Sequence, residues 1–406
     1  MLKNIIFFFF IFLAFFSKAI SAVGEGAYTT SGNQVAVIDV ALNSVVASIS
    51  VGNSPIGIVF TPDFSNAYVV NSGSSSVSVI DTATLSVIET ITDFDGDQIQ
   101  YLAILPDGSK IYVTNLDSNF LFVIDTATNT VTTTIAVGAF TTKLAASPDS
   151  AKIYVNSGFI IYVIDTATDT VSATINTQIQ DVAFSPDGTK AYATLPPFLK
   201  IIDTATDAQI ATVNFGGTGS NSSVDFAPDG SVAYITTQPE EALFIIDVAT
   251  DTVTGSISVG NPPTDIAFST DSSIAYISGN FISVIDVAGS TVSTTIALSS
   301  SQIVMGQVEL PIPTNITASG YCKKNIFFSD TDYINRISWD PFPSGGIKYI
   351  IYRNASLTEK AGETSISTTV FNDHNRIPGQ NYTYYITVVT SGGSQTLIAT
   401  TTVQTR

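Results

Sequence analysis

The stretch S-P-D-G-T-K-A-Y-A-T at residues 185–194, followed by I-I-D-T-A-T at residues 201–206, decides the fold of this chain. Pro, Asp and Gly form turns, and the neighbouring runs are rich in the β-branched and aromatic residues that strands prefer. We therefore expect four short strands in this unit, named A to D in chain order. They are predicted at residues 181–185, 190–194, 199–203 and 209–213.

The unit recurs along the chain. Seven Ile-Asp pairs follow one another at spacings of 38 to 44 residues, with their aspartates at Asp39, Asp81, Asp125, Asp165, Asp203, Asp247 and Asp286. The P-D-G marker is clearest at residues 106–108, 186–188 and 228–230. Four short strands in each repeat of this length are typical of a β-propeller blade. The sequence therefore predicts an all-β propeller.

The two ends of the repeat region predict how the ring closes. A B-type strand opens the region at residues 27–30, and an extra A-type strand ends it at residues 302–309. One blade built from both ends would tie the ring shut and leave no long exposed edge. Seven blades are predicted on this count. Six complete blades with loose ends are the alternative.

These motifs resemble a known family. The run I-Y-V-T-N at residues 111–115, followed by the V-I-D-T-A-T box at 123–128, is similar to the bacterial YVTN-type, surface-layer-like β-propeller repeat. The resemblance covers roughly residues 24–310, with departures at 192–194 and 276–278 and no P-D-G in the last blade. It implies an exported or cell-surface protein with a seven-bladed ring, in a family most of whose members have no assigned reaction.

The composition changes after the Pro-rich linker at residues 310–313. Residues 23–310 hold 28 acidic residues against five lysines, a net charge of −23, whereas residues 311–406 carry a net charge of +2. The tail alternates apolar and polar residues as a β-sandwich does. Its spacings resemble a fibronectin type III domain, and the resemblance implies that Trp339 is the core tryptophan and Tyr382 the corner tyrosine. Such modules act as spacers or binding modules.

The N-terminal 22 residues match the pattern of a secretory signal peptide. Lys3 precedes an uncharged stretch of 12 residues at 5–16, which is too short to span a bilayer as a helix, and small residues follow. Cleavage is expected after Ala19 or Ala22; an uncleaved anchor is the alternative. The predicted parts are therefore a signal peptide (1–22), a propeller (23–310) and a fibronectin III-like sandwich (311–406). We expect a bacterial periplasmic, cell-surface or extracellular protein without a transmembrane segment after cleavage.

Composition excludes several chemistries. The chain has a formal charge of −19, one His and one Cys. This rules out an internal disulfide and a His-rich metal site, and it disfavours nucleic acid, whose phosphates need clustered Lys or Arg. A reactive role for Cys322 or His374 is less favoured than an inert thiol and a polar loop residue. No cofactor is expected, apart from a possible Ca²⁺ ion.

That ion would bind the acidic loop D-F-D-G-D at residues 93–97, which only one blade carries. Asp93, Asp95 and Asp97 are the metal-ligand candidates, because alternating carboxylates around a Gly can gather oxygen ligands for Ca²⁺. A solvated acidic loop is the favoured alternative. The seven Ile-Asp aspartates and the P-D-G aspartates are interpreted as turn-capping residues instead.

The blades differ from one another on one face only. In a propeller the A–B and C–D turns share one face, and here those turns carry the repeated motifs. The B–C and D–A loops share the other face and vary, as binding loops on a rigid frame do. Six residues before each A–B-turn Asp, at position −6, the strand should line the channel mouth on the variable face. The residues there are Gly57, Tyr101, Lys143, Asp181, Ser223 and Asp265.

We predict Tyr101, Lys143, Asp181 and Asp265 as ligand-binding residues, with a hydrated channel mouth as the alternative. The predicted function is an exported, non-enzymatic binding or scaffold protein that presents this acidic, variable face to a peptide, glycan or protein. A lactonase-like propeller hydrolase with a carboxylate-bound metal near Asp93, Asp95 or Asp181 is the alternative. It is disfavoured because residues 23–310 contain no His, Arg or Cys. A structural protein of the cell envelope is a third interpretation.

Overall fold

The computed structural model describes residues 22–40, 43–94, 98–138, 140–219 and 221–310, together with segments of the C-terminal part. Those segments are residues 317–324, 331–338, 348–353, 360–365, 370–373, 380–389 and 395–404. One compact unit comprises Val23–Glu309, and Leu310–Arg406 belongs to another. None of the helical structure described here is long and apolar enough to cross a membrane. The predicted signal peptide lies outside these residues except for Ala22.

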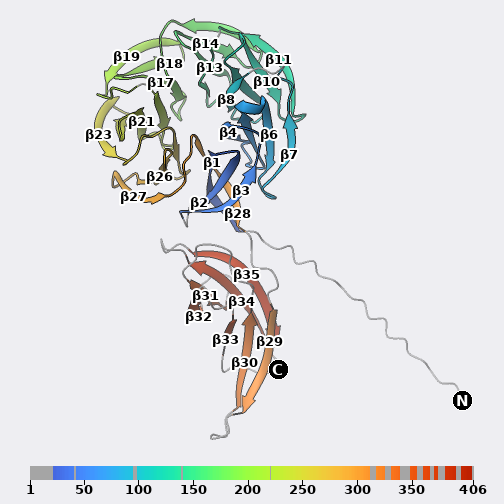
Figure 1. Ribbon diagram of the computed structural model, residues 1–406. Helices are drawn as coiled ribbons and strands as arrows, with labels where there is room; N and C mark the ends of the chain where they lie inside the picture. Colours follow the sequence, from blue (N-terminus) through green and yellow to red (C-terminus); the bar gives the residue numbers. More distant parts are fainter. Residues whose placement is uncertain are drawn as a thin grey trace, which may run out of the picture. The chain divides into compact units, whose positions relative to one another are not determined.

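The first unit is a ring of seven four-stranded antiparallel sheets within the described residues (Figure 1). Six blades are continuous in the chain. They are β4–β7 (Pro55–Phe60, Asn66–Asn71, Ser76–Asp81, Ser86–Ile91), β8–β11 (Ile99–Ile104, Lys110–Asn115, Phe120–Asp125, Thr130–Ala136), β12–β15 (Leu144–Ala146, Lys152–Ser157, Ile160–Asp165, Thr170–Ile175), β16–β19 (Asp181–Phe184, Lys190–Leu195, Phe198–Asp203, Ala208–Asn214), β20–β23 (Asn221–Phe226, Val232–Gln238, Ala242–Asp247, Thr252–Ser258) and β24–β27 (Ile266–Phe268, Ile274–Ile277, Ile282–Asp286, Thr291–Ile296). A short 3-10 turn, η1 (Ser72–Ser74), joins β5 to β6. The predicted seven-bladed propeller is confirmed.

The seventh blade is built from both ends of the repeat region. Its strand order is β28 (Ile303–Leu310), β1 (Ala22–Ser31), β2 (Gln34–Asp39) and β3 (Ser44–Ser50). The Tyr28 hydroxyl donates to the Gln307 carbonyl at 2.7 Å, across 279 residues of chain. The predicted composite blade is therefore confirmed, and the alternative of six blades with loose ends is wrong.

The repeated motifs close the turns and tie them together. Asp125 Oδ1 accepts hydrogen bonds from the N–H groups of Ala127 at 3.0 Å and Thr128 at 2.9 Å. Thr126 Oγ1 donates to the carbonyl of Gly108 at 2.5 Å, which links the C–D turn to the A–B turn of the same blade. Gly108 has a φ of +77°, a conformation that glycine adopts without strain. The interpretation of these aspartates as turn-capping residues is confirmed in this blade.

Every blade buries a tyrosine of its B strand, and in five blades the hydroxyl of that tyrosine bonds the C–D turn of the next blade. The seven tyrosines, all less than 2% exposed, are Tyr28, Tyr68, Tyr112, Tyr154, Tyr192, Tyr234 and Tyr276. The ring of Tyr154 packs against Phe184 of the next blade, with centroids 4.6 Å apart, and its hydroxyl donates to Asp207 of that blade's C–D turn at 2.5 Å. Lys152 donates to the same carboxylate at 2.8 Å. We call this Tyr-to-turn contact the interblade clamp.

The acceptor of the clamp sits at a backbone position with positive φ. The fifth residue of every C–D turn has φ between 48° and 54°: Asn43, Leu85, Asn129, Asp169, Asp207, Asp251 and Ser290. Asn and Asp tolerate this left-handed conformation better than other L-residues, and they also supply the oxygen that the tyrosine needs. Five of the seven turns therefore use one residue for both purposes.

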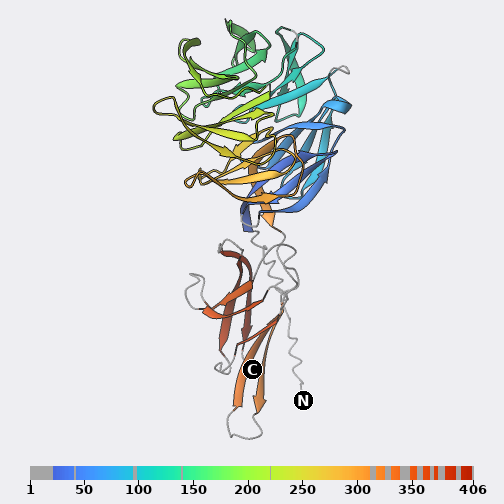
Figure 2. The same ribbon diagram turned by 60° about the vertical axis from the view of Figure 1, so that its left-hand side comes forward.

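The second unit contains two antiparallel sheets in the part that the structure describes (Figure 2). One has the order β29 (Thr317–Lys324), β30 (Thr331–Ser338), β33 (Val370–Asp373); the other has the order β32 (Lys360–Ser365), β31 (Lys348–Tyr352), β34 (Asn381–Val389), β35 (Gln395–Gln404). Buried Asp373 accepts hydrogen bonds from Arg353 at 2.7 and 2.9 Å and from the Tyr384 hydroxyl at 2.8 Å. Tyr382 is half-buried, and the predicted core residue Trp339 lies outside the described residues, as does His374.

The clamp predicts a stabilising substitution at Ser290. Tyr234 faces this turn, yet its hydroxyl makes no hydrogen bond to the described residues, whereas Tyr68 donates to Asn129 Oδ1 at 2.6 Å. We expect Ser290→Asn to stabilise the propeller by about 1 kcal/mol, because it adds an acceptor and suits the positive φ. That gain corresponds to a melting temperature raised by about 2–4 °C, measured by differential scanning fluorimetry.

The matched control is Asn129→Ser, which should lower the melting temperature by a similar amount. Equal melting temperatures for all three proteins would contradict the role assigned to the clamp.

Candidate functional site

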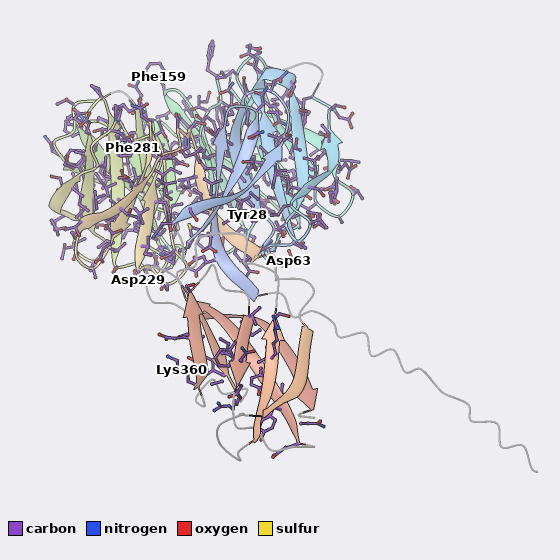
Figure 3. The ribbon with its side chains drawn as sticks, turned by 60° about the horizontal axis from the view of Figure 1, so that its bottom comes forward. Tyr28, Asp63, Phe159, Asp229, Phe281 and Lys360 are labelled. Carbon is purple, nitrogen blue, oxygen red and sulfur yellow. The ribbon has the colours of Figure 1, made fainter. Side chains whose placement is uncertain are left out.

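The two faces of the propeller carry different loops. In Figure 3, Asp63 and Asp229 of two A–B turns lie at one face of the ring, and Phe159 and Phe281 of two B–C loops lie at the other. We call the face with the B–C and D–A loops the variable face, because its residues differ from blade to blade.

A cavity of about 610 Å³ opens on the variable face. Every blade contributes to its lining the residue seven positions before the A–B-turn Asp, or the equivalent residue in the closing blade: Ile56, Gln100, Thr142, Gln180, Ser222, Thr264 and Ser301. Since the innermost strand of every blade takes part, the cavity surrounds the axis of the ring. Its volume lies within the range of about 300–1,000 Å³ that is usual for small-molecule sites.

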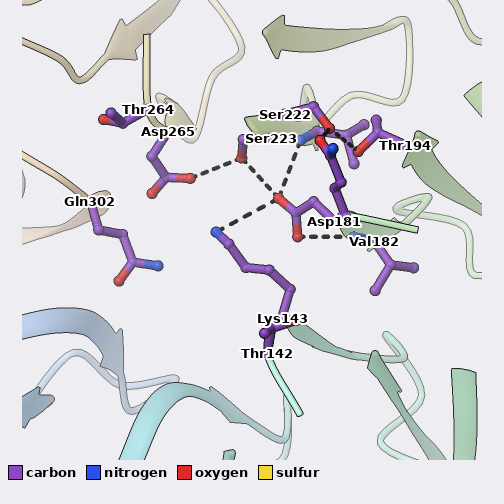
Figure 4. A network of polar contacts seen from close by, with 12 residues as sticks. Thr142, Lys143, Asp181, Val182, Thr194, Ser222, Ser223, Thr264, Asp265 and Gln302 are labelled. Carbon is purple, nitrogen blue, oxygen red and sulfur yellow. Dashed lines mark hydrogen bonds and ion pairs between the residues drawn. The ribbon is translucent and has the colours of Figure 1, made fainter. Parts of the chain in front are cut away.

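Below this ring of residues, the side chains at position −6 form a polar network (Figure 4). Lys143 Nζ lies 3.7 Å from Asp181 Oδ2 and 4.6 Å from the centroid of the Tyr101 ring. Ser223 Oγ lies 2.9 Å from Asp181 Oδ2 and 3.0 Å from Asp265 Oδ1. Each of these residues comes from a different blade, so the network joins five blades around the channel. We call it the channel belt.

The belt includes a sixth residue, Gln302, that the sequence analysis missed. Asp265 Oδ2 accepts the N–H of Ile303 in the following blade at 3.1 Å, and Gln302 Oε1 accepts the N–H of Ile58 in the blade after that at 3.0 Å. Gln302 therefore occupies position −6 of the closing blade. At Gly57 a Cβ atom would lie 2.6 Å from Leu102 Cδ2, so a larger residue there would have to displace the Leu102 side chain.

Burial and charge act against each other in the belt. Burial lowers the pKa of Lys143, but the carboxylates of Asp181 and Asp265 outweigh it and hold that pKa above the ordinary value, so the ammonium stays charged. Burial raises the pKa of Asp265 despite the opposing charge of Lys143.

The four predicted ligand-binding residues come together, but they do not all reach the cavity. Tyr101 and Lys143 line it. Asp181 and Asp265 are only 6% and 8% exposed, and their oxygens bind neighbouring blades instead of lining the cavity. Ligand binding by these residues stays a prediction.

The predicted metal loop is only partly described. Asp93 is exposed, and Asp95 and Asp97 lie outside the described residues. Within the described part of the chain, no three His, Cys, Asp or Glu side chains gather in a way that could hold a metal ion. The neighbouring Phe94 is fully buried and packs edge-on against Phe122, with centroids 5.2 Å apart.

Asp225 is a further carboxylate of the channel that the sequence analysis did not single out. It stands at position −4, where Ala103, Ala145, Ala183 and Ala267 occupy other blades. Burial, reinforced by the charges of Asp265 and Asp181, raises its pKa to about 8, although the N–H of Phe226 opposes this with a hydrogen bond of 2.9 Å. The sequence feature that could have identified Asp225 is an acidic residue at a repeat position that holds a small, apolar residue in other blades.

Comparisons with known proteins show the fold alone. No protein-family model matches the chain, and no curated protein matches it. Two similar solved structures are a Kuenenia stuttgartiensis hydrazine synthase and a functionally unknown protein from Desulfotomaculum acetoxidans. The first is 19% identical, with a TM-score of 0.56, and the match covers 69% of this chain and 95% of that one. The second is 14% identical, with a TM-score of 0.60 and coverages of 70% and 99%.

The raised pKa of Asp225 predicts a pH dependence of stability. A native carboxyl that binds its proton more tightly than the unfolded chain favours folding below its ordinary pKa of 3.8, and this advantage is lost as the pH rises toward about 8. We expect Asp225→Asn to match the natural protein in melting temperature near pH 4. It should exceed the natural protein by a margin that grows up to about pH 8 and is constant above it.

The exposed Asp117 provides a control with the same change in formal charge, Asp117→Asn. Parallel melting curves for Asp225→Asn and the natural protein from about pH 4 to about pH 9 would contradict the assigned pKa.

Proposed function

We propose that this chain is an exported, non-enzymatic binding or scaffold protein that presents its variable propeller face to a peptide, glycan or protein. The observation that carries the proposal is the cavity on that face, because all seven blades contribute to it. A repeated fold that places one residue from each of seven blades, of four different types, around one recess is suited to recognising a ligand.

Two features favour binding over catalysis. Residues 23–310 contain no His, Arg or Cys, so a histidine base and a thiol nucleophile are both missing from the propeller sequence. The carboxylates of Asp181 and Asp265 accept hydrogen bonds from Ser223 and from the backbone of the next blade. Their oxygens are thereby engaged in holding the ring together.

The compartment and the second unit belong to the same proposal. The signal-peptide pattern and the resemblance to the YVTN-type repeat support export to the bacterial envelope or the medium. The three-stranded and four-stranded antiparallel sheets support a fibronectin type III-like spacer or binding module in residues 311–406.

The proposal predicts that ligands depend on the cavity. Ligands of the purified protein would be selected from a displayed peptide library and a printed glycan array. We expect Tyr101→Ala and Phe140→Ala each to weaken the binding of such a ligand by about tenfold, because both aromatic side chains line the cavity. Biolayer interferometry measures the dissociation constants.

Ile210→Ala is the control, since Ile210 is 62% exposed on the outermost strand β19 and does not line the cavity. Ligands that bind every variant equally would contradict the assignment of the cavity as the binding site.

The alternative, a hydrolase with a carboxylate-bound metal, predicts a response to Ca²⁺. We expect the melting temperature to be the same with and without millimolar Ca²⁺, because the binding proposal requires no metal. A rise that Asp95→Asn abolishes and Asp117→Asn retains would favour the hydrolase instead.

A further inference from the structure

The lining of the cavity is almost free of charge. Lys143 is the only charged residue among the described residues that line it, and Asp181 neutralises that ammonium from 3.7 Å. The propeller sequence as a whole holds 28 acidic residues against five lysines. A charged ligand would therefore find no free countercharge in this recess, whereas a neutral polar ligand faces no electrostatic penalty.

Primary amides dominate the polar lining instead. The propeller sequence contains nine glutamines, and five of them line the cavity: Gln100, Gln178, Gln180, Gln238 and Gln302. An amide side chain carries a carbonyl acceptor and an N–H₂ donor on the same carbon atom. Hydroxyl groups are both donors and acceptors, so amides match them in either direction.

Three of these amides are held at one end by a hydrogen bond, and the part of the chain that the structure describes supplies no partner for their other end. Gln180 Oε1 accepts from Ser222 at 2.9 Å, and Gln302 Oε1 accepts from the N–H of Ile58 at 3.0 Å, which leaves both Nε2 groups as donors. Gln100 Nε2 donates to Ser72 at 3.2 Å, which leaves its Oε1 as an acceptor. The protein thus fixes the amides before a ligand arrives, and this reduces the entropy lost on binding.

Asn156 adds a side-chain oxygen that receives no hydrogen bond from the described residues. It lines the cavity and is only 3% exposed, and its Nδ2 donates to the carbonyl of Ile179 at 3.2 Å. A carbonyl can only accept, so this contact fixes the orientation of the amide. Asn156 Oδ1 is buried and accepts no hydrogen bond from the described residues. An acceptor left in this state costs stability unless a further donor reaches it.

An aromatic side chain stands at the rim with no packing role. Phe140 lines the cavity, is 70% exposed and has a φ of +61°. Neither burial nor backbone preference favours a phenylalanine in such a position. Its exposure at the mouth of the recess leaves the ring accessible to a ligand. Its ring offers an apolar face to a ligand whose other sides are polar.

We propose that the cavity binds the terminal sugar residues of a neutral glycan. A sugar ring carries hydroxyls around its edge and C–H groups on its faces, so it uses both the amides and the aromatic ring. The seven blades present their polar groups from all sides of one closed recess. That arrangement suits a compact ligand with hydroxyls in every direction better than an extended peptide, which needs a linear groove. This inference rests on the proposed binding function and names its ligand class.

The test uses the purified protein on a printed glycan array that carries neutral, sialylated and uronic-acid glycans. We expect the bound glycans to end in neutral sugars, and saturation-transfer NMR to show contact with their ring C–H protons. Gln180→Glu keeps the acceptor for Ser222 and removes the Nε2 donor, so it should weaken binding by about fivefold. Phe140→Ala should weaken it by about tenfold.

Phe198→Ala is the matched control, because Phe198 is a 41% exposed phenylalanine on the same face that does not line the cavity; binding should stay within about twofold. Binding of acidic glycans alone would overturn the inference. So would neutral glycans whose affinity is unchanged by Gln180→Glu and Phe140→Ala. If no glycan binds, but peptides bind and lose affinity in Tyr101→Ala and Phe140→Ala, the glycan inference is overturned and the proposed binding function is retained. Failure of both ligand classes would overturn both.

Discussion

The interblade clamp is the constraint on which the rest of the molecule depends. Five of the seven buried B-strand tyrosines pack against the next blade and donate their hydroxyl to its C–D turn, because a buried hydroxyl without a partner is costly. Tyr154 makes both contacts, with Phe184 and Asp207, and the same arrangement recurs at Tyr192 with Phe226 and Asp251. Tyr276 of the last continuous blade reaches Asn43 of the closing blade at 2.9 Å. Within the closing blade, the Tyr28 hydroxyl instead donates to Gln307 of β28, which ties the two ends of the repeat region together.

The clamp also explains where the few positive charges of the propeller go. Lys110, Lys152 and Lys190 each join the tyrosine of their own strand on one carboxylate of the next blade, at 2.7, 2.8 and 2.5 Å. Lys200 donates to Thr177 Oγ1 at 2.8 Å. Only Lys143 remains for the channel, and it pairs with Asp181. The face with the repeated turns thus takes the charges that hold the ring, and the variable face keeps a nearly neutral recess in an otherwise acidic protein.

The sequence was sufficient for the strands and for the closure of the ring, and insufficient for the side-chain contacts between repeats. Turn markers and strand composition predicted the strands, their number and the closing blade, because each follows from local preferences copied seven times. Gln302 was not predicted because its blade has no P-D-G turn, and position −6 is defined by its distance from the Asp of that turn. The engagement of Asp181 and Asp265 could not be foreseen, since their shared partner Ser223 stands 42 residues from each along the chain and becomes a neighbour only in the ring.

The channel belt gives the cavity a floor that cannot easily deform. Its contacts run from Tyr101 through Lys143, Asp181, Ser223 and Asp265 to the closing blade, and Gln302 continues them to the first blade. Removing one member would leave a buried polar or charged neighbour unpaired, so the belt holds its members in one geometry. Seven of the cavity-lining residues, one from each blade, directly precede position −6 in the chain and therefore lie next to this rigid belt. Two of the amides, Gln100 and Gln180, are among these seven, whereas the other amides come from the belt, the loops and a B strand.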